Sequence, residues 1–223
     1  LLVSLIGLQW YNSPAVYQTP VGGQQVITLA DSTRVTLNTG SELLVYRMGK
    51  TRRATLVRGE ALFDVAHDAD HPFIVKAGKR SVIVRGTSFV VRNDPQHFNV
   101  SLITGRVEVA YNDKVVTLQP GQRYRANPQT SGAIDRPQLA MVTAWRKGEL
   151  MLDNMRVGDA VAEMNRYSAK PIIIRSPALA NQRISGVFRT GESAMFANTI
   201  ATLYGAPLND TARAWTVGSA GAQ

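Results

Sequence analysis

The feature that most constrains the fold is a two-residue alternation of apolar and polar side chains, which recurs between Gln25 and Ala126. The stretch FNVSL places Phe98, Val100 and Leu102 on one face of an extended chain, and RVEVAY repeats the pattern. Turn-forming pairs such as Thr-Gly and Asn-Asp separate these runs at intervals of roughly 8–12 residues. The alternation predicts a mainly β domain without helices, built as an antiparallel β-sandwich or a solenoid-like sheet.

The two-residue alternation of apolar and polar side chains ends near Ala126. Residues 127–137 (NPQTSGAIDRP) are rich in turn-forming residues and indicate a linker that trails the β domain of residues 25–137. Beyond it, strand-like runs alternate with two helical patterns, in the order β-α-β-β-α-β. This order predicts a small split βαβ domain of the α+β class over residues 138–223. The apolar residues at helical spacing are Val157, Ala160, Val161 and Met164 in the first pattern, and Phe196, Ile200 and Leu203 in the second.

The first ten residues, LLVSLIGLQW, are apolar. A membrane-spanning helix needs about 20 such residues. We interpret this segment as the end of a truncated transmembrane helix, with Trp10 and Tyr11 at the interfacial level, followed by a linker up to residue 24. A signal-peptide remnant and an apolar strand of the domain are the alternatives.

Charge and composition limit the possible functions. The 223-residue chain has a formal net charge of +9, but its basic residues are scattered and no nucleic-acid-reading motif accompanies them. This pattern favours an acidic partner or an anionic membrane over nucleic acid. The absence of cysteine excludes disulfides and zinc–thiolate sites. With no nucleophile elbow, phosphate loop or dinucleotide fingerprint, we expect neither a cofactor nor an enzyme acting on a separate substrate.

A series of motifs follows in fixed order over about a hundred residues: LADSTRVTLNTGSEL, LVRGEALFDVAHDADHPFIVKAG, VRGTSFVV, SLITGRVEVA and VTLQPGQRY. This series resembles the periplasmic domain of FecR-type anti-sigma regulators. The segment from WRKGELMLDNM onward resembles the short secretin/TonB-type signalling domain that ends many of these proteins. The positions that match the FecR skeleton are Asp31-Ser32, Leu37-Asn38, Gly59-Glu60-Ala61, Phe63, Val65, Pro72-Phe73, Gly86-Thr87, Phe89, Gly105 and Pro120-Gly121.

The resemblance implies a function in iron uptake. The chain would be the periplasmic part of a single-pass inner-membrane regulator in a Gram-negative bacterium. It would bind the N-terminal signalling domain of a TonB-dependent outer-membrane siderophore transporter, and a cytoplasmic segment absent here would hold an ECF sigma factor. Periplasmic and intramembrane proteases would process the regulator as further partners, and no nucleic acid is expected.

Gly86-Thr87 is the candidate site of chemistry. A threonine hydroxyl can attack the preceding carbonyl and form an ester that water hydrolyses, if the peptide is strained and a base lies nearby. The resemblance implies such self-cleavage, because some FecR-like regulators cut at this step. The competing hypothesis is that Gly86 makes a bulge between two strands and that Thr87 is an ordinary strand residue. The structural hypothesis leads, and self-processing is the alternative function.

The run AHDADH contains four potential metal ligands: His67, Asp68, Asp70 and His71. Aspartates in turns commonly cap their own backbone, and nothing in the sequence fixes a second shell of partners around an ion. We therefore interpret the run as a turn and predict no metal site.

Partner binding is expected in the second domain, because a small sheet offers edge strands that can pair with a strand of another protein. Large side chains that could anchor an interface are Trp145, Met151, Tyr167, Phe188, Met195 and Trp215. Arg156, Arg183 and Arg189 could attract an acidic partner. The residues predicted to contact the partner are Met151, Ile173, Phe188, Arg189 and Trp215. A third hypothesis, a carbohydrate-binding β-sandwich, would need an exposed aromatic platform, for which 7% aromatic residues give little material.

Overall fold

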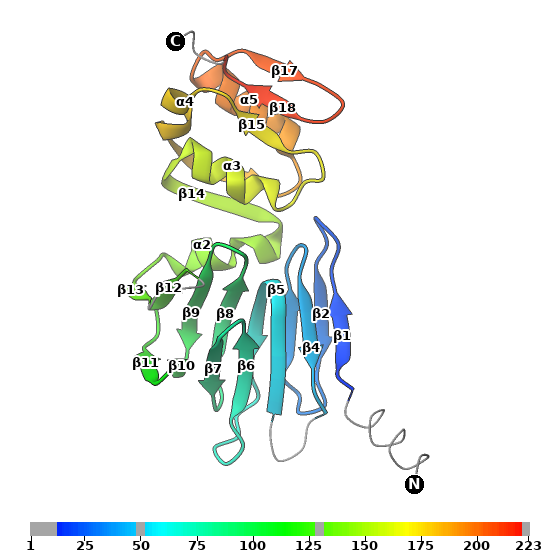
Figure 1. The fold of residues 1–223 in the computed structure, drawn as a ribbon, viewed down its shortest axis with the longest axis vertical. Coiled ribbons are helices and arrows are strands. Elements are labelled where there is room, and N and C mark those ends of the chain that lie inside the picture. The colour runs from blue at the N-terminus through cyan, green and yellow to red at the C-terminus, as the bar shows by residue number, and fades with distance from the viewer. Residues whose placement is uncertain (1–12, 48–51, 128–131, 220–223) are drawn as a thin grey trace. The chain divides into compact units, whose positions relative to one another are not determined.

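The computed structural model describes residues 13–47, 52–127 and 132–219. The chain divides into two compact units, one with the described residues up to Pro20 and Gln24–Leu139, the other with Val21–Gly23 and the residues from Ala140 onward. The predicted fold class is confirmed: a large curled sheet accounts for most of the secondary structure, and a smaller α+β unit follows it (Figure 1).

The first unit is a thirteen-stranded sheet within the described residues. Its strands are β1 (Ala15–Gln18), β2 (Gln25–Thr28), β3 (Arg34–Leu37), β4 (Glu42–Val45), β5 (Arg52–Asp64), β6 (Phe73–Ala77), β7 (Arg80–Val84), β8 (Ser88–Asn93), β9 (Phe98–Thr104), β10 (Val107–Tyr111), β11 (Lys114–Leu118), β12 (Arg123–Ala126) and β13 (Ala133–Asp135).

Strand β5 organises the first unit because its two halves pair with different neighbours. The first half pairs with β4 and β6, and the second half pairs with β3 and β8. The partners change at Gly59, where φ is +90° and a Cβ atom would lie 2.3 Å from Ser41 Oγ. Only glycine allows the backbone to adopt this conformation against Ser41. The long strand thus passes from one part of the curled sheet to the other.

The pairing departs from the predicted antiparallel pattern at one place. Strands β5 and β6 run parallel, with Arg52 opposite Phe73, whereas the other described pairs of the first unit are antiparallel. The connection at residues 65–72 brings the chain back to the start of β5. The unit has one apolar core, to which Phe63 contributes by stacking on Phe89 at 5.2 Å between ring centroids. The predicted inward face of FNVSL is confirmed, since its three apolar residues are at most 2% exposed.

Two predicted linkers contain strands. Ala15–Gln18, within the predicted linker up to residue 24, forms β1 and pairs with β4. Ala133–Asp135, within the predicted linker of 127–137, forms β13 and pairs with β12. Both strands are short and mostly exposed, so neither carries the alternation that reveals a half-buried strand. The predicted membrane segment at residues 1–10, with Trp10 and Tyr11, lies outside the described residues.

The second unit places its strands in two small sheets instead of one. Strand β14 pairs antiparallel with β16, while β18 pairs with β15 in parallel and with β17 antiparallel. Its elements are α2 (Leu139–Thr143), η1 (Ala144–Lys147), β14 (Glu149–Arg156), α3 (Val157–Asn165), β15 (Ile172–Ile174), α4 (Pro177–Asn181), β16 (Arg183–Arg189), α5 (Ser193–Leu203), β17 (Leu208–Asp210) and β18 (Trp215–Val217).

The two predicted helices form and supply most of this unit's core. The predicted apolar stripe of α3 is fully buried. In α5, Phe196 and Ile200 are buried as predicted. The prediction for Leu203 is wrong, because this last residue of the helix is 60% exposed. The small residues Ala197 and Ala201 take the buried positions of that face instead. Across the described part of the chain, no helix has the length and apolar character needed to cross a membrane.

Candidate functional site

Gly86 and Thr87 lie in the short connection between β7 and β8, which are the two apolar runs on either side of them in the sequence. Two backbone hydrogen bonds hold this connection against the segment that follows β5. The amide of Val65 donates to the carbonyl oxygen of Thr87 (3.0 Å), and the amide of Asp68 donates to the carbonyl oxygen of Arg85 (2.8 Å). The Gly-Thr step is therefore held in place within the connection between β7 and β8.

Glycine is required at position 86 by packing. A Cβ atom there would lie 2.4 Å from Nδ1 and 3.0 Å from Cα of His67. Gly105 approaches the same step from the other side, since a Cβ atom on it would lie 2.9 Å from both the carbonyl oxygen of Gly86 and Oγ1 of Thr87. The step is thus enclosed between an imidazole and a neighbouring turn, and a shallow pocket of about 260 Å³ opens beside it.

The hydroxyl of Thr87 is buried and already engaged. Its Oγ1 donates a hydrogen bond to the carbonyl oxygen of Arg106 (3.0 Å), and the residue is 5% exposed. A peptide carbonyl is an acceptor that does not take up the proton, so this contact orients the hydroxyl without activating it. The imidazole of His67 lies against Gly86, whereas a base-assisted attack would need a base within hydrogen-bond reach of Thr87 Oγ1. The geometry therefore explains Gly86-Thr87 as a packing element and leaves self-cleavage as a prediction.

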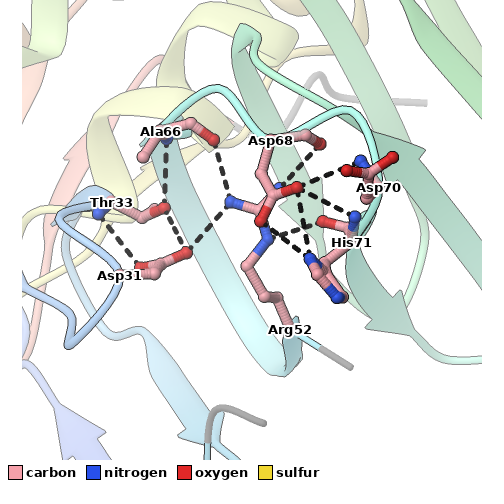
Figure 2. A network of polar contacts seen from close by, with 7 residues as sticks. All are labelled: Asp31, Thr33, Arg52, Ala66, Asp68, Asp70 and His71. Carbon is pink, nitrogen blue, oxygen red and sulfur yellow. Dashed lines mark hydrogen bonds and ion pairs between the residues drawn. The ribbon is translucent and has the colours of Figure 1, made fainter. Parts of the chain in front are cut away.

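The loop after β5 is pinned by a buried arginine (Figure 2). Arg52 Nε donates to the carbonyl oxygen of His71 (2.7 Å), Nη1 to that of Ala66 (2.8 Å) and Nη2 to that of Asp68 (3.4 Å). Nη1 also forms an ion pair with Asp31 (3.2 Å). The parallel pairing of β5 with β6 produces this arrangement, because it brings the start of β5 beside the end of the loop.

Within that loop, Asp68 caps the backbone in the manner predicted for a turn. The amides of Asp70 and His71 each donate to Asp68 Oδ1 at 3.0 Å, and His71 Nδ1 lies 3.1 Å from Oδ2. The backbone hydrogen bond from His71 is the main cause that lowers the pKa of Asp68 below its ordinary value of 3.8. His67 packs on Gly86 instead of joining them. The described residues contain no cluster of three or more metal-binding side chains.

The sequence reasoning missed two buried arginines. Arg52 is 4% exposed and Arg80 is 2% exposed. The Arg80 guanidinium lies 4.2 Å from the ring centroid of Tyr111 and 5.0 Å from that of Phe98, and Nη2 donates to the carbonyl oxygen of Asn127 (2.8 Å). A signal was available, because each arginine stands in register with the inward-facing apolar residues of its own strand.

In the second unit, two of the predicted contact residues share one face. The register of the β14–β16 sheet places Met151 opposite Val187 and Glu149 opposite Arg189, all on the side away from the core. Val187 is 58% exposed, and Arg189 is exposed as well. This side of the sheet, defined by these four residues, is called the outer face below.

The other predicted contact residues lie elsewhere. Phe188 points to the inner side, where its ring meets Phe196 edge-on at 4.7 Å between centroids. Ile173 and Trp215 belong to the separate β15–β18–β17 sheet, where Trp215 is half-buried and Lys170 Nζ lies 4.2 Å from the centroid of its ring. Ile173 is 37% exposed. The five predicted residues therefore do not form one surface: Met151 and Arg189 share the outer face, and Phe188 lies on the inner side of the same sheet.

Comparison with known proteins bears on the first unit most directly. Residues 15–108 match the family model of FecR protein, which confirms the resemblance inferred from the motifs. Comparison with curated proteins gives no match.

Comparison with solved structures extends the likeness to nearly the whole chain. Two crystal structures of a protein from Parabacteroides distasonis ATCC 8503, described as a putative anti-sigma factor, share 24% sequence identity with this chain. One gives a TM-score of 0.80 over 91% of this chain and 98% of the other, and the second gives 0.79 over 92% and 99%. At this level of identity the likeness shows a shared fold.

Proposed function

We propose, from a FecR-like β-unit followed by a small α+β unit, that this chain is the signal-receiving part of a membrane-anchored anti-sigma regulator. It binds the N-terminal signalling domain of a TonB-dependent siderophore transporter in the periplasm and relays iron-uptake signalling to an ECF sigma factor. The observation that carries this proposal is the FecR family match over residues 15–108.

The second unit supports the binding role. In the described chain, β14 and β16 pair only with each other, so the outer edge of each strand pairs with no other strand. Free strand edges are ready-made sites for pairing with another protein. Val187 and Arg189 lie exposed beside such an edge. A signalling domain that supplies a strand would find hydrogen-bonding groups, an apolar side chain and a cation together.

The first unit supports a structural role in the relay. Its core is continuous, and its buried arginines fix the loop before β6 and the end of β12 through backbone carbonyls. A domain held by so many buried contacts is suited to a structural role. The chemistry that frees the sigma factor would come from separate periplasmic and intramembrane proteases.

Self-processing at Gly86-Thr87 is the second candidate, and one observation favours it: the imidazole of His67 packs against Gly86. The hydrogen bond from Thr87 Oγ1 to Arg106 and the burial of Thr87 oppose it, because an attacking hydroxyl must leave this partner. The hydrogen bond of Thr87 Oγ1 to Arg106 and the close approach of His67 and Gly105 support a structural role for the step.

The proposal is tested in the source bacterium with a reporter that depends on the ECF sigma factor that the regulator is proposed to hold. Addition of the cognate ferric siderophore is expected to induce the reporter in the presence of the intact regulator. Deletion of residues 140–223 from the regulator's gene is expected to abolish induction while the protein remains detectable. Normal induction after this deletion would overturn the proposed role of the second unit.

A further inference from the structure

The outer face of the β14–β16 sheet is unusual in combining charge and exposed apolar surface along one strand. The side chains of β16 that point outward are Arg183, Ser185, Val187 and Arg189, whereas Ile184 and Phe188 point inward. The strand therefore presents two arginines and no carboxylate. Among the described residues, Arg189 makes no ion pair, and the guanidinium of Arg183 donates a hydrogen bond to the carbonyl oxygen of Asn154 (2.7 Å).

A groove of about 430 Å³ runs between the second half of β16 and the start of α5. It is lined by Val187, Phe188 and Arg189 of the strand and by Met195 of the helix, with Glu192 and Phe196 beside them. Successive strand residues point to opposite sides, so a groove bordered by both Val187 and Phe188 has to pass around an edge of β16. Since β14 occupies one edge, the groove lies along the open one.

The groove has an apolar rim and a positive end. Val187 is 58% exposed and Met195 is 60% exposed, so two apolar side chains face solvent across it. Helix α5 begins at Ser193 without a side-chain cap on its first amides, and the positive end of the helix dipole lies there. Glu192 offsets part of this potential, and Arg189, which lies opposite Glu149 in the register of the sheet, is the cation among the residues that line the groove.

We propose that the open edge of β16 and this groove receive an extended segment of the partner signalling domain. That segment pairs with β16 through backbone hydrogen bonds, places an acidic side chain against Arg189 and inserts an apolar side chain between Val187 and Met195. The inference rests on the proposed function for the identity of the partner, and it names the surface and the chemistry that the partner must supply.

Charge complementarity argues for an acidic partner strand over a second copy of this chain. Antiparallel pairing of two β16 strands about Gly186 would place Arg183 of one copy directly opposite Arg189 of the other. Like charges in directly opposed cross-strand positions are destabilising. A partner strand with carboxylates at the corresponding positions meets both arginines favourably, because opposite charges across an interface raise the association rate and fix the register.

The test uses the whole chain immobilised on a surface plasmon resonance chip, with the purified signalling domains of TonB-dependent transporters from the same bacterium as the probes. We expect Arg189→Glu and Met195→Asp each to raise Kd by about tenfold or more. The matched controls are Leu203→Asp, at the far end of α5 and equally exposed at 60%, and Arg213→Glu, in the exposed turn before β18. Both controls are expected to change Kd by less than about threefold.

The outcomes separate the two levels of the proposal. Binding by the wild-type chain that neither Arg189→Glu nor Met195→Asp weakens beyond the controls would overturn this surface and leave the relay function standing. No binding by the wild-type chain would overturn the relay function and the surface with it. Slower hydrogen exchange of the β16 amides in the complex, without slowing in β15, is the result expected from strand pairing.

Discussion

At the residue scale, Arg52 accounts for the shape of a whole loop. Its guanidinium donates hydrogen bonds to three backbone carbonyl oxygens of residues 66–71 and forms an ion pair with Asp31. The side chain is only 5% exposed. Burial of a charge is costly unless hydrogen bonds and an opposite charge compensate it. The arginine is therefore well satisfied in place, and its removal leaves several acceptors without donors.

Replacement of Arg52 by Met is expected to lower the free energy of unfolding by about 3 kcal/mol, because Asp31 and the loop carbonyls lose their partner. Urea unfolding followed by far-UV circular dichroism measures this change. The control is Arg53→Met on the exposed face of the same strand, where the guanidinium lies over Tyr46 at 4.5 Å from the ring centroid. The control should cost less than about 1 kcal/mol; equal losses for both variants would contradict the assigned role of Arg52.

Gly86→Ala is expected to destabilise the first unit by about 1–3 kcal/mol, because the new Cβ atom meets the His67 side chain. Thermal unfolding of the single variant and of the Gly86→Ala, His67→Ala pair measures the clash. The pair should be more stable than the sum of the single changes predicts, since the imidazole is the nearest obstacle. Strict additivity would show that His67 is not what requires glycine at this position.

Thr87→Ala distinguishes the structural role of the step from self-cleavage. The Thr87 hydroxyl donates a hydrogen bond to the carbonyl oxygen of Arg106. We therefore expect the wild-type protein, like the alanine variant, to show one intact mass when fresh and after ageing at 37 °C. Intact-protein mass spectrometry gives the answer. If the wild type yields two fragments, one ending at Gly86 and one beginning at Thr87, and Thr87→Ala yields neither, self-processing is the better account.

At the element scale, the short strand β13 is fixed by a polar pair. Strand β13 has three residues and little burial, but Asp135 accepts two hydrogen bonds from its cross-strand neighbour Arg123 (2.9 and 2.8 Å). These bonds, together with the nearby charge of Arg125, hold the pKa of Asp135 below its ordinary value of 3.8, against a smaller opposing effect of burial. The ion pair therefore contributes to the stability of this edge.

The contribution of Asp135 depends on pH in a defined direction. A carboxylate with a lowered pKa in the folded state stabilises the protein above its ordinary pKa, and this stability is lost as the pH falls through the folded-state pKa. We expect Asp135→Asn to cost at most about 1 kcal/mol at pH 7, because the pair is partly exposed, and to cost less below pH 3. The control Asp113→Asn, in the exposed turn after β10, should show no such dependence. A cost that does not change with pH would contradict the ion pair.

Alternation in the sequence predicts the elements of the β-unit better than their partners. It identifies β9 and β10 and their buried faces, because every second residue there is apolar. It misses β1 and β13, whose stability comes from pairing with β4 and β12 and not from a buried face of their own. It does not reveal the parallel β5–β6 pair either, since register depends on contacts between residues far apart in the sequence.

The candidate sites show the same limit. Gly86-Thr87 is found from its composition, but its contacts with His67 and Gly105 come from segments distant in sequence. In the second unit, residue type alone suggested five contact residues, and the division into two sheets separates Ile173 and Trp215 from Met151 and Arg189. Val187 and Met195 gain their importance from exposure, which a sequence of apolar residues does not disclose.

At the scale of the whole molecule, the two units have complementary properties. The β-unit matches the FecR family over residues 15–108 and has a continuous core, while the second unit combines two small sheets with open edges and an arginine-bearing groove. The chain as a whole carries a net charge of +9, which favours rapid association with an acidic partner. The open edges and the groove fit the binding role proposed for the second unit, and the continuous core fits the structural role proposed for the first.

The most direct test of the relay is a calorimetric titration of the whole chain with the signalling domains of any TonB-dependent transporters that are co-encoded with it. We predict one-to-one binding with a Kd in the micromolar range or tighter, weakened by added salt because the contact includes arginines. The signalling domain of an unrelated transporter serves as the control and should bind at least about tenfold more weakly. No heat of binding with any co-encoded signalling domain would contradict the account and leave the FecR-like fold without its proposed partner.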